Sequence, residues 1–397
     1  MERGEAFVGH QLDLHIFIDA FGWRILENHA FLDDQTPHRR PLRTVAGYSC
    51  AAVPALLTGR SPADLRRLSF YYYDPANSPF RRVSWPLRLL PGLVANRGRV
   101  RRHISRAVGR WLGFTGYFQL YNVPFQHLGL FSTCETTDIF AHGGLSPCRS
   151  IFDFLRDRNV ELHCSDWRAD ETTNLRAAER AVRREETRWA FVYLPALDGL
   201  MHAEGTKSPA VGEKIAFYDQ WVRRLCEAAC HDHVRLTVVS DHGMSDVTQH
   251  CDVEREINQL GLQFGRDYVA FYDSTMARFW YLNAAAQDRI ESRLRELPCG
   301  SVLTPDELRR SGADFADQRF GQTIFLVRPG RLIVPSFMGR TGLAAMHGYT
   351  PDDADADAMM VCSEPIAPEV AAITDVFQHM TESLQEETRS QQELVTS

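Results

Sequence analysis

The chain of 397 residues has little lysine, and one long stretch of it has no acidic residue. Lys207 and Lys214 are the only lysines, so nearly all of the fixed positive charge is arginine. Between Pro75 and Cys134 there is no Asp or Glu, whereas nine arginines occur there. The net charge of the whole chain is nevertheless −7, which argues against a general binder of nucleic-acid duplexes.

The nine cysteines lack the spacing of a structural framework. Their number is odd and no CxxC pair occurs, so neither a set of disulfides nor a zinc ribbon is indicated. Cys226 and Cys230, followed by His231 and His233, could hold a metal ion. At this helical spacing they more simply form one buried face, and we expect free thiols throughout.

Long apolar runs are missing as well. No run approaches the roughly 18 residues of a membrane span, and the first residues, MERGEAFVGHQ, lack the basic-then-apolar order of a signal peptide. We therefore expect a cytoplasmic protein. The segment 381–397 is polar without apolar periodicity, which predicts a disordered tail.

What the chain does contain is an alternation of short apolar runs with amphipathic segments. This alternation predicts an α/β fold with a mostly parallel central sheet and helices on both faces. The expected strands are Leu14–Ile18, Val160–His163, Ala190–Leu194 and Leu236–Ser240, and the expected helices include Ile151–Arg158 and Lys214–Ala229.

Acidic and histidine residues follow three of these strands. Asp19 comes directly after the first strand, Asp198 soon after the third, and Asp241 with His242 after the fourth. Because active sites of such sheets lie beyond the carboxyl ends of the strands, we expect these side chains to meet at one rim.

The strongest single motif is GYSCAAVPALLTGRSP at residues 47–62. Ser49 precedes a predicted helix, where free backbone N–H groups and the helix dipole favour an alkoxide and a bound phosphate. Taken alone, a serine in this place is more often a simple N-cap.

With the other motifs added, the sequence resembles the alkaline phosphatase superfamily, and within it the type I phosphodiesterase/nucleotide pyrophosphatase family. Five blocks carry the resemblance in the family's order. They are IFIDAFGWR with Asp19, the Ser49 motif with LLTGRSP, YLPALDGLMH with Asp198 and His202, VVSDHGM with Asp241 and His242, and AAMHGY with His347.

The resemblance implies an alkaline phosphatase-like fold and a two-metal phosphoester hydrolase that acts through a phosphoserine. In its pattern Asp198, His202 and His347 hold one divalent cation, and the other is held by Asp19, Asp241, His242 and the Ser49 oxygen. Such mixed oxygen and nitrogen ligands suit Zn²⁺, or Mn²⁺ less tightly. Two cations about 4 Å apart can clamp an in-line displacement at phosphorus, and no base is then needed beside the serine.

Departures from the family pattern concern the nucleophile and the phosphate. Many phosphodiesterases use threonine where Ser49 stands, and the adjacent Cys50 is a rival nucleophile that the spacing to Gly59 disfavours. The residues after Ser49 do not fit a sulfatase motif. Where relatives place a phosphate-binding asparagine, this chain has Phe70, so Asn77 from a longer loop, or an arginine, would have to bind the phosphate.

Two segments look like insertions into a catalytic core that comprises 1–251 and 341–380. The first, at about 61–133, forms an arginine-rich lid, and the second, at 252–340, a small α+β cap. Within the lid, residues 81–114 mix arginine with Trp, Leu and Phe. This part could be a solvated lid, bind an anionic part of the substrate, or touch a membrane surface.

The expected substrate is a small phosphodiester or pyrophosphate, linked to a nucleotide or a lipid. A phosphomonoesterase or phosphosugar mutase of the same superfamily is the nearest alternative, since a cap could keep water from a phosphoserine. A non-catalytic binding module is the alternative of another class.

Overall fold

The computed structural model describes residues 11–90, 97–382 and 384. Its centre is a six-stranded sheet in which five strands run in one direction and β16 runs against its two neighbours. The expected mostly parallel sheet is thus confirmed. In spatial order its strands are β2 (His38–Leu42), β16 (Ala358–Cys362), β7 (His233–Val239), β1 (Gln11–Ile18), β6 (Trp189–Leu194) and β5 (Leu162–Cys164).

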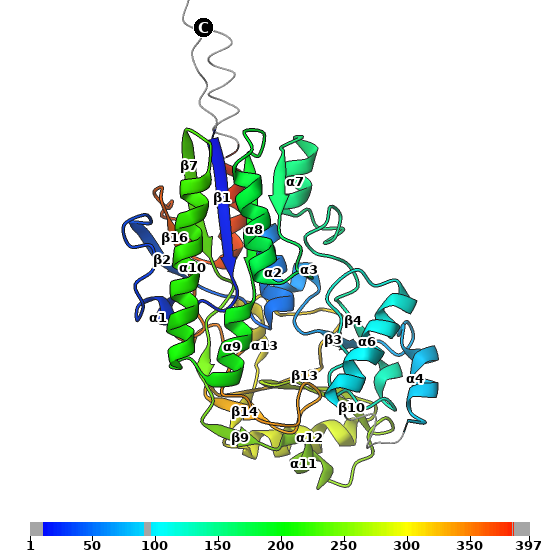
Figure 1. Ribbon diagram of the computed structural model, residues 1–397. Coiled ribbons are helices and arrows are strands. Elements are labelled where there is room, and N and C mark those ends of the chain that lie inside the picture. Colours follow the sequence, from blue (N-terminus) through cyan, green and yellow to red (C-terminus); the bar gives the residue numbers. More distant parts are fainter. Residues whose placement is uncertain (1–10, 91–96, 383, 385–397) are drawn as a thin grey trace, which may run out of the picture.

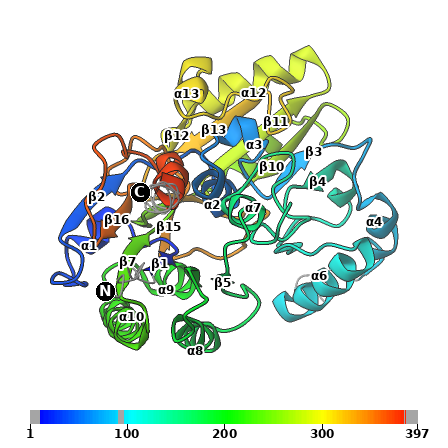
Figure 2. The ribbon, with the colours of Figure 1, turned by 90° about the horizontal axis from the view of Figure 1, so that it is seen from above.

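Helices cover both faces of this sheet (Figures 1 and 2). Strand β1 packs Leu14 and Ile16 against the helices of one face, while Phe17 packs into a separate core on the other. The first face carries α8 (Glu171–Val182), α9 (Ala196–Glu204) and α10 (Pro209–Ala228), with α1 (Trp23–Leu26) at its edge; the second carries α2 (Ser49–Thr58), α7 (Ile151–Asp157) and the 3₁₀ turn η2 (Ile373–Asp375).

The register of the parallel strands brings their carboxyl ends to one edge. Ile18 pairs with Leu194 of β6, and Phe17 pairs with Val239 of β7. The residues that follow all three strands therefore leave the sheet side by side. This alignment places the predicted acidic and histidine side chains at the same rim.

The segment predicted as a cap contains an antiparallel four-stranded sheet. The expected strand, helix and strand occur as β11, α12 and β13, and two further strands flank them. The elements are β10 (Tyr268–Tyr272), β11 (Met276–Tyr281), β13 (Thr323–Val327), β12 (Gly300–Val302), α11 (Val253–Asn258), α12 (Ala284–Glu296) and α13 (Pro305–Arg310).

The arginine-rich insertion packs against this cap sheet. Tyr71 of the insertion stacks on Phe271 of β10, with ring centroids 5.3 Å apart, and both belong to one buried hydrophobic cluster that spans the two insertions. The division into lid and cap remains a proposal, because the two segments share this core. The insertion contributes α3 (Pro62–Leu65), β3 (Tyr71–Tyr73), α4 (Arg81–Leu87), α6 (Gly98–Leu112), η1 (Leu128–Leu130) and β4 (Phe131–Thr133).

A buried polar network also joins the insertions. The Arg278 guanidinium donates to Asp273 through Nε (2.7 Å), to the Tyr71 carbonyl (2.7 Å) and to Ser69 Oγ (3.1 Å). Ser69 in turn donates to Asp273 at 2.6 Å. Arg278 and Asp273 are fully buried, so each charge depends on the other for its partner.

Two short strand pairs tie the cap and the late histidine to the core: β14 (Arg331–Ile333) with β9 (Gln249–Cys251), and β15 (Ala345–Met346) with β8 (Ser245–Asp246). The predicted tail begins inside a helical stretch over 376–382, where Thr381 is buried; most of the tail lies outside the described residues. Within the described residues, none of the helices combines the length and apolar character that a membrane crossing demands.

Candidate active site

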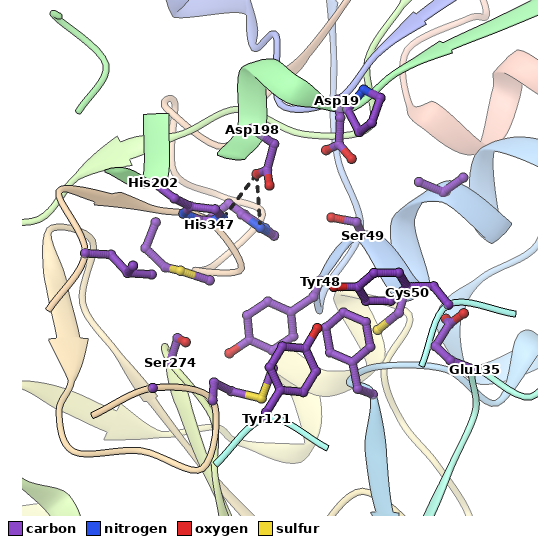
Figure 3. Close-up of a pocket in the computed structure, with 18 of the residues that line it drawn as sticks. Asp19, Tyr48, Ser49, Cys50, Tyr121, Glu135, Asp198, His202, Ser274 and His347 are labelled. Carbon is purple, nitrogen blue, oxygen red and sulfur yellow. Dashed lines mark ion pairs between the residues drawn. The ribbon is translucent and has the colours of Figure 1, made fainter. Parts of the chain in front are cut away.

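The structure brings all seven predicted nucleophile and metal-site residues to one rim. Figure 3 shows five of them, Asp19, Ser49, Asp198, His202 and His347. Each comes from an element that ends or begins there. Asp19 follows β1, Asp241 and His242 follow β7, Asp198 and His202 lie one turn apart on α9, His347 follows β15, and Ser49 opens α2.

Ser49 is the first residue of α2 and does not cap the helix. The N-cap position belongs to Tyr48, which makes no side-chain cap bond. The Ser49 hydroxyl instead lies 3.0 Å from Nε2 of His242. An imidazole beside the serine was not expected from the sequence, because His242 is distant in the chain and was assigned to a metal.

The first group of candidate ligands surrounds His242. Its Nε2 lies 3.2 Å from Oδ2 of Asp241 and 3.6 Å from Oδ1 of Asp19. Nδ1 lies 2.9 Å from the Gly243 carbonyl, which fixes the proton on Nδ1 and leaves the Nε2 lone pair facing the carboxylates. A nitrogen lone pair aimed at carboxylate oxygens is the arrangement that a cation would stabilise.

The second group surrounds Asp198. Its Oδ1 lies 3.2 Å from His202 Nε2 and 3.6 Å from His347 Nε2. The Ala345 carbonyl lies 2.8 Å from Nδ1 of His202, so here too Nε2 is the free ligand atom. The two groups meet where the His242 and His347 rings stack, with centroids 3.8 Å apart.

His347 is held in place by the backbone that follows it. Gly348 has a φ of +81°, and a Cβ there would lie 2.7 Å from the Tyr48 ring, so glycine is required on both counts. Tyr48 and His347 also meet edge to face, with ring centroids 5.8 Å apart. The residue before the nucleophile thus positions the late histidine.

The site fits divalent cations because its buried oxygens have no other partner. Oδ1 of Asp19, Oδ1 of Asp198 and Oδ2 of Asp241 are buried without a hydrogen bond, a state that normally costs free energy. Geometrically, Asp19, Asp241 and His242 could share one ion, and Asp198, His242 and His347 another.

The electrostatics of the cation-free site agree with this. Burial and the nearby Asp198 charge together raise the pKa of Asp241 to about 7. Burial and the charge of Asp241 likewise raise the pKa of Asp19 well above its usual range. At Asp198 burial also opposes ionisation, but the adjacent His202 imidazole and the other nearby imidazoles outweigh it and lower the pKa. Negative charge is thus disfavoured at Asp19 and Asp241 unless a cation compensates it.

We expect cation affinity to fall as pH drops through about 7. Below that pH the Asp241 carboxyl of the cation-free protein holds a proton, which a cation must displace. Calorimetric titration of Zn²⁺ across this range, in buffers of different ionisation enthalpy, measures both the affinity and the protons released. An affinity that stays constant from about pH 8 to about pH 5 would contradict a carboxylate site of this kind.

A cavity of about 500 Å³ opens beside Ser49. Its walls combine aromatic, aliphatic and acidic side chains, and none of the described residues that line it is Lys or Arg. Asn77 is not among them; it is exposed and its side-chain amide donates to Asp74 at 3.1 Å. Phe70, by contrast, lines the cavity. The aromatic lining residues are Tyr48, Phe70, Tyr117, Tyr121, Phe140, Trp167 and Tyr193.

Two tyrosines at the site were missed by the sequence analysis. The Tyr193 hydroxyl donates to Oδ2 of Asp19 at 3.1 Å, and its place near the end of β6 could have suggested this. Tyr121 lies in the cavity with a left-handed φ of 42°, and Nη1 of the buried Arg101 donates to its carbonyl. Such strain in a non-glycine residue often marks a functional position, but no pattern in the sequence predicted that Tyr121 would lie in the site.

A family model for type I phosphodiesterase/nucleotide pyrophosphatase matches residues 14–350. The chain belongs to this family. It is therefore a hydrolase of phosphodiester bonds, in a metal-dependent family, and its substrates are small phosphoesters. No curated protein matches the sequence significantly.

Solved structures of distant relatives share the alkaline phosphatase-like fold. Human ectonucleotide pyrophosphatase/phosphodiesterase 5 superposes with a TM-score of 0.68 at 14% identity, over 94% of this chain and 95% of that one. The murine counterpart gives 0.67 at 14% identity with the same coverage. An inactive threonine-to-alanine variant of the murine protein in complex with AMP gives 0.66 at 15% identity, again with that coverage.

Proposed function

We propose that the protein cleaves phosphodiesters through a covalent phosphoserine on Ser49, in a site that holds two divalent cations. The observation that supports this most directly is the meeting of Ser49 with two carboxylate–imidazole groups. Asp19, Asp241, His242 and Ser49 would hold one cation, and Asp198, His202 and His347 the other. Zn²⁺ fits these nitrogen and oxygen ligands best, with Mn²⁺ as the alternative.

Bound cations would supply charge that lowers the pKa of the serine hydroxyl and neutralises the phosphoryl oxygens. The Ser49 oxygen then attacks phosphorus, and the bond from phosphorus to the leaving oxygen breaks. Water hydrolyses the resulting phosphoserine and restores the hydroxyl. Tyr193 keeps the Asp19 carboxylate oriented through its hydrogen bond.

The cavity favours a diester over a monoester. A monoester brings a second negative charge, and the walls supply no Lys or Arg among the described residues to pair with it. A diester carries one charge and a second organic group, for which an aromatic cavity of about 500 Å³ has room. Nucleotide-linked and lipid-linked diesters both meet this description, and the AMP complex of the murine relative motivates the nucleotide case.

The test compares bis(p-nitrophenyl) phosphate with p-nitrophenyl phosphate on the Zn²⁺- or Mn²⁺-loaded protein and on the chelated protein. We expect faster diester turnover that chelation abolishes and added metal restores. Faster monoester turnover would point to a phosphatase. Phosphate transfer between sugar phosphates without release would point to a mutase, and no metal-dependent turnover of either compound to a binding module.

A further inference from the structure

The arginines of the first insertion form a concentration of unbalanced charge on the surface. Nine arginines lie between Pro75 and Cys134; all but Arg101 are exposed, and no ion pair joins these eight exposed arginines to any other residue that the structure describes. Elsewhere exposed arginines commonly pair with carboxylates, as Arg149 does with Asp157 and Arg295 with Glu291. The eight exposed arginines between Pro75 and Cys134 are Arg81, Arg82, Arg88, Arg97, Arg99, Arg102, Arg106 and Arg110.

On helix α6 these charges lie along one stripe. Arg99, Arg102, Arg106 and Arg110 recur at helical spacing, opposite the side that buries Ser105 and Val108. Like charges four residues apart repel each other. Arg99, in the first turn, also opposes the helix dipole, and no acidic residue lies there to offset it. The stripe therefore destabilises the helix, which points to a role other than folding.

Large apolar side chains are exposed among these arginines. Trp85 is 60% exposed, Leu89 68% and Trp111 63%. Helices α4 and α6 lie side by side at the outer edge of the molecule in both ribbon views (Figures 1 and 2). We call the exposed side chains of residues 81–90 and 97–111 the outer basic face.

We infer that the outer basic face docks on the surface of an anionic lipid bilayer. The positive charge complements anionic headgroups, and exposed tryptophan and leucine side chains can enter the boundary between headgroups and acyl chains. A polyanion such as nucleic acid binds proteins through charge and through stacking on aromatic rings, so exposed leucines would not contribute to its binding. The arginines do not serve the reacting phosphate, because none lines the cavity.

The experiment is co-sedimentation of the full chain with vesicles of phosphatidylcholine alone or mixed with phosphatidylserine. We expect binding to the mixed vesicles only, weakened when salt rises from about 0.1 M to about 1 M and the Debye length falls from about 10 Å to about 3 Å. The quadruple variant R99Q/R102Q/R106Q/R110Q should bind about 600-fold more weakly, because each of the four arginines near such a surface strengthens binding roughly fivefold.

The matched control is R156Q/R176Q/R180Q/R184Q, in which four exposed arginines outside the outer basic face are replaced. This control should bind vesicles as the wild type does. A second variant, W85S/L89S/W111S, tests the apolar contribution; its control is L282S, which alters an exposed leucine of the cap. The variant W85S/L89S/W111S should lose vesicle binding while keeping diester turnover and thermal stability. Equal binding to neutral vesicles, or equal loss in the arginine control, would overturn the inference. Full binding by W85S/L89S/W111S would show a polyanion site instead.

Discussion

Ser49→Ala should lower diester turnover by about 10⁴-fold or more, the scale on which loss of a covalent nucleophile acts. The hydroxyl is the only group of the site that can form the proposed phosphoserine and lies in contact with His242. Alanine suits the first turn of a helix, and six candidate metal ligands remain. The variant should therefore stay folded and bind metal. Steady-state rates and calorimetric metal titration measure the two properties separately.

Cys50→Ala is the matched control for this prediction. Cys50 is adjacent to Ser49 and lines the same cavity, but burial raises the pKa of its thiol well above the usual range. The neutral thiol is a poor nucleophile, so this variant should keep most of its turnover. Rapid-quench peptide mapping should find phosphate on Ser49 in the wild type. If Ser49→Ala stays active and Cys50→Ala does not, the assignment of the nucleophile is wrong.

Arg278→Ala should lower the free energy of unfolding by about 3–5 kcal/mol, the usual loss when one partner of a buried ion pair is removed. The substitution leaves Asp273 buried without its guanidinium, and burial already raises the pKa of that carboxyl with Arg278 present. It also leaves the Tyr71 carbonyl without its donor. Urea titration with matched slopes measures the change.

The control for this variant is Arg66→Ala. Arg66 pairs with Asp317, but both side chains are largely exposed, so the expected loss is about 1 kcal/mol or less. The double variant R278M/D273L should recover part of the lost stability, because neither charge is then left buried alone. A loss below about 1 kcal/mol for Arg278→Ala would show that the network does not hold the insertions together.

Much of the central sheet could be predicted because its strands are short apolar runs between amphipathic helices. The errors lie at boundaries, at the edge strand β2 and at the inner strand β16, which also went unpredicted. Strand β7 begins at His233, and its start was placed at Leu236 because two of its first three residues are polar. Strand β2, with sequence HRRPL, went unpredicted since it is charged and contains Pro41. An edge strand tolerates both features, and Arg40 donates to the Ala367 carbonyl instead of meeting solvent alone.

The candidate metal ligands could be predicted from their order in the chain, because strand ends in a parallel sheet converge. The cavity beside Ser49 could not be predicted in this way. Tyr117, Tyr121 and Trp167 come from loops whose path depends on packing against distant segments, and local sequence carries no record of that path. Asn77 illustrates the same limit, since its loop turns it toward Asp74.

The common core of the two insertions has a consequence for how relatives of this enzyme could be recombined. Phe271 of the second insertion stacks on Tyr71 of the first and meets Phe131 edge to face. A graft that exchanged only one of the segments would leave half of that aromatic interface facing a foreign surface. A chimera that aims to transplant substrate preference should therefore carry both segments across together, although they are far apart in the gene.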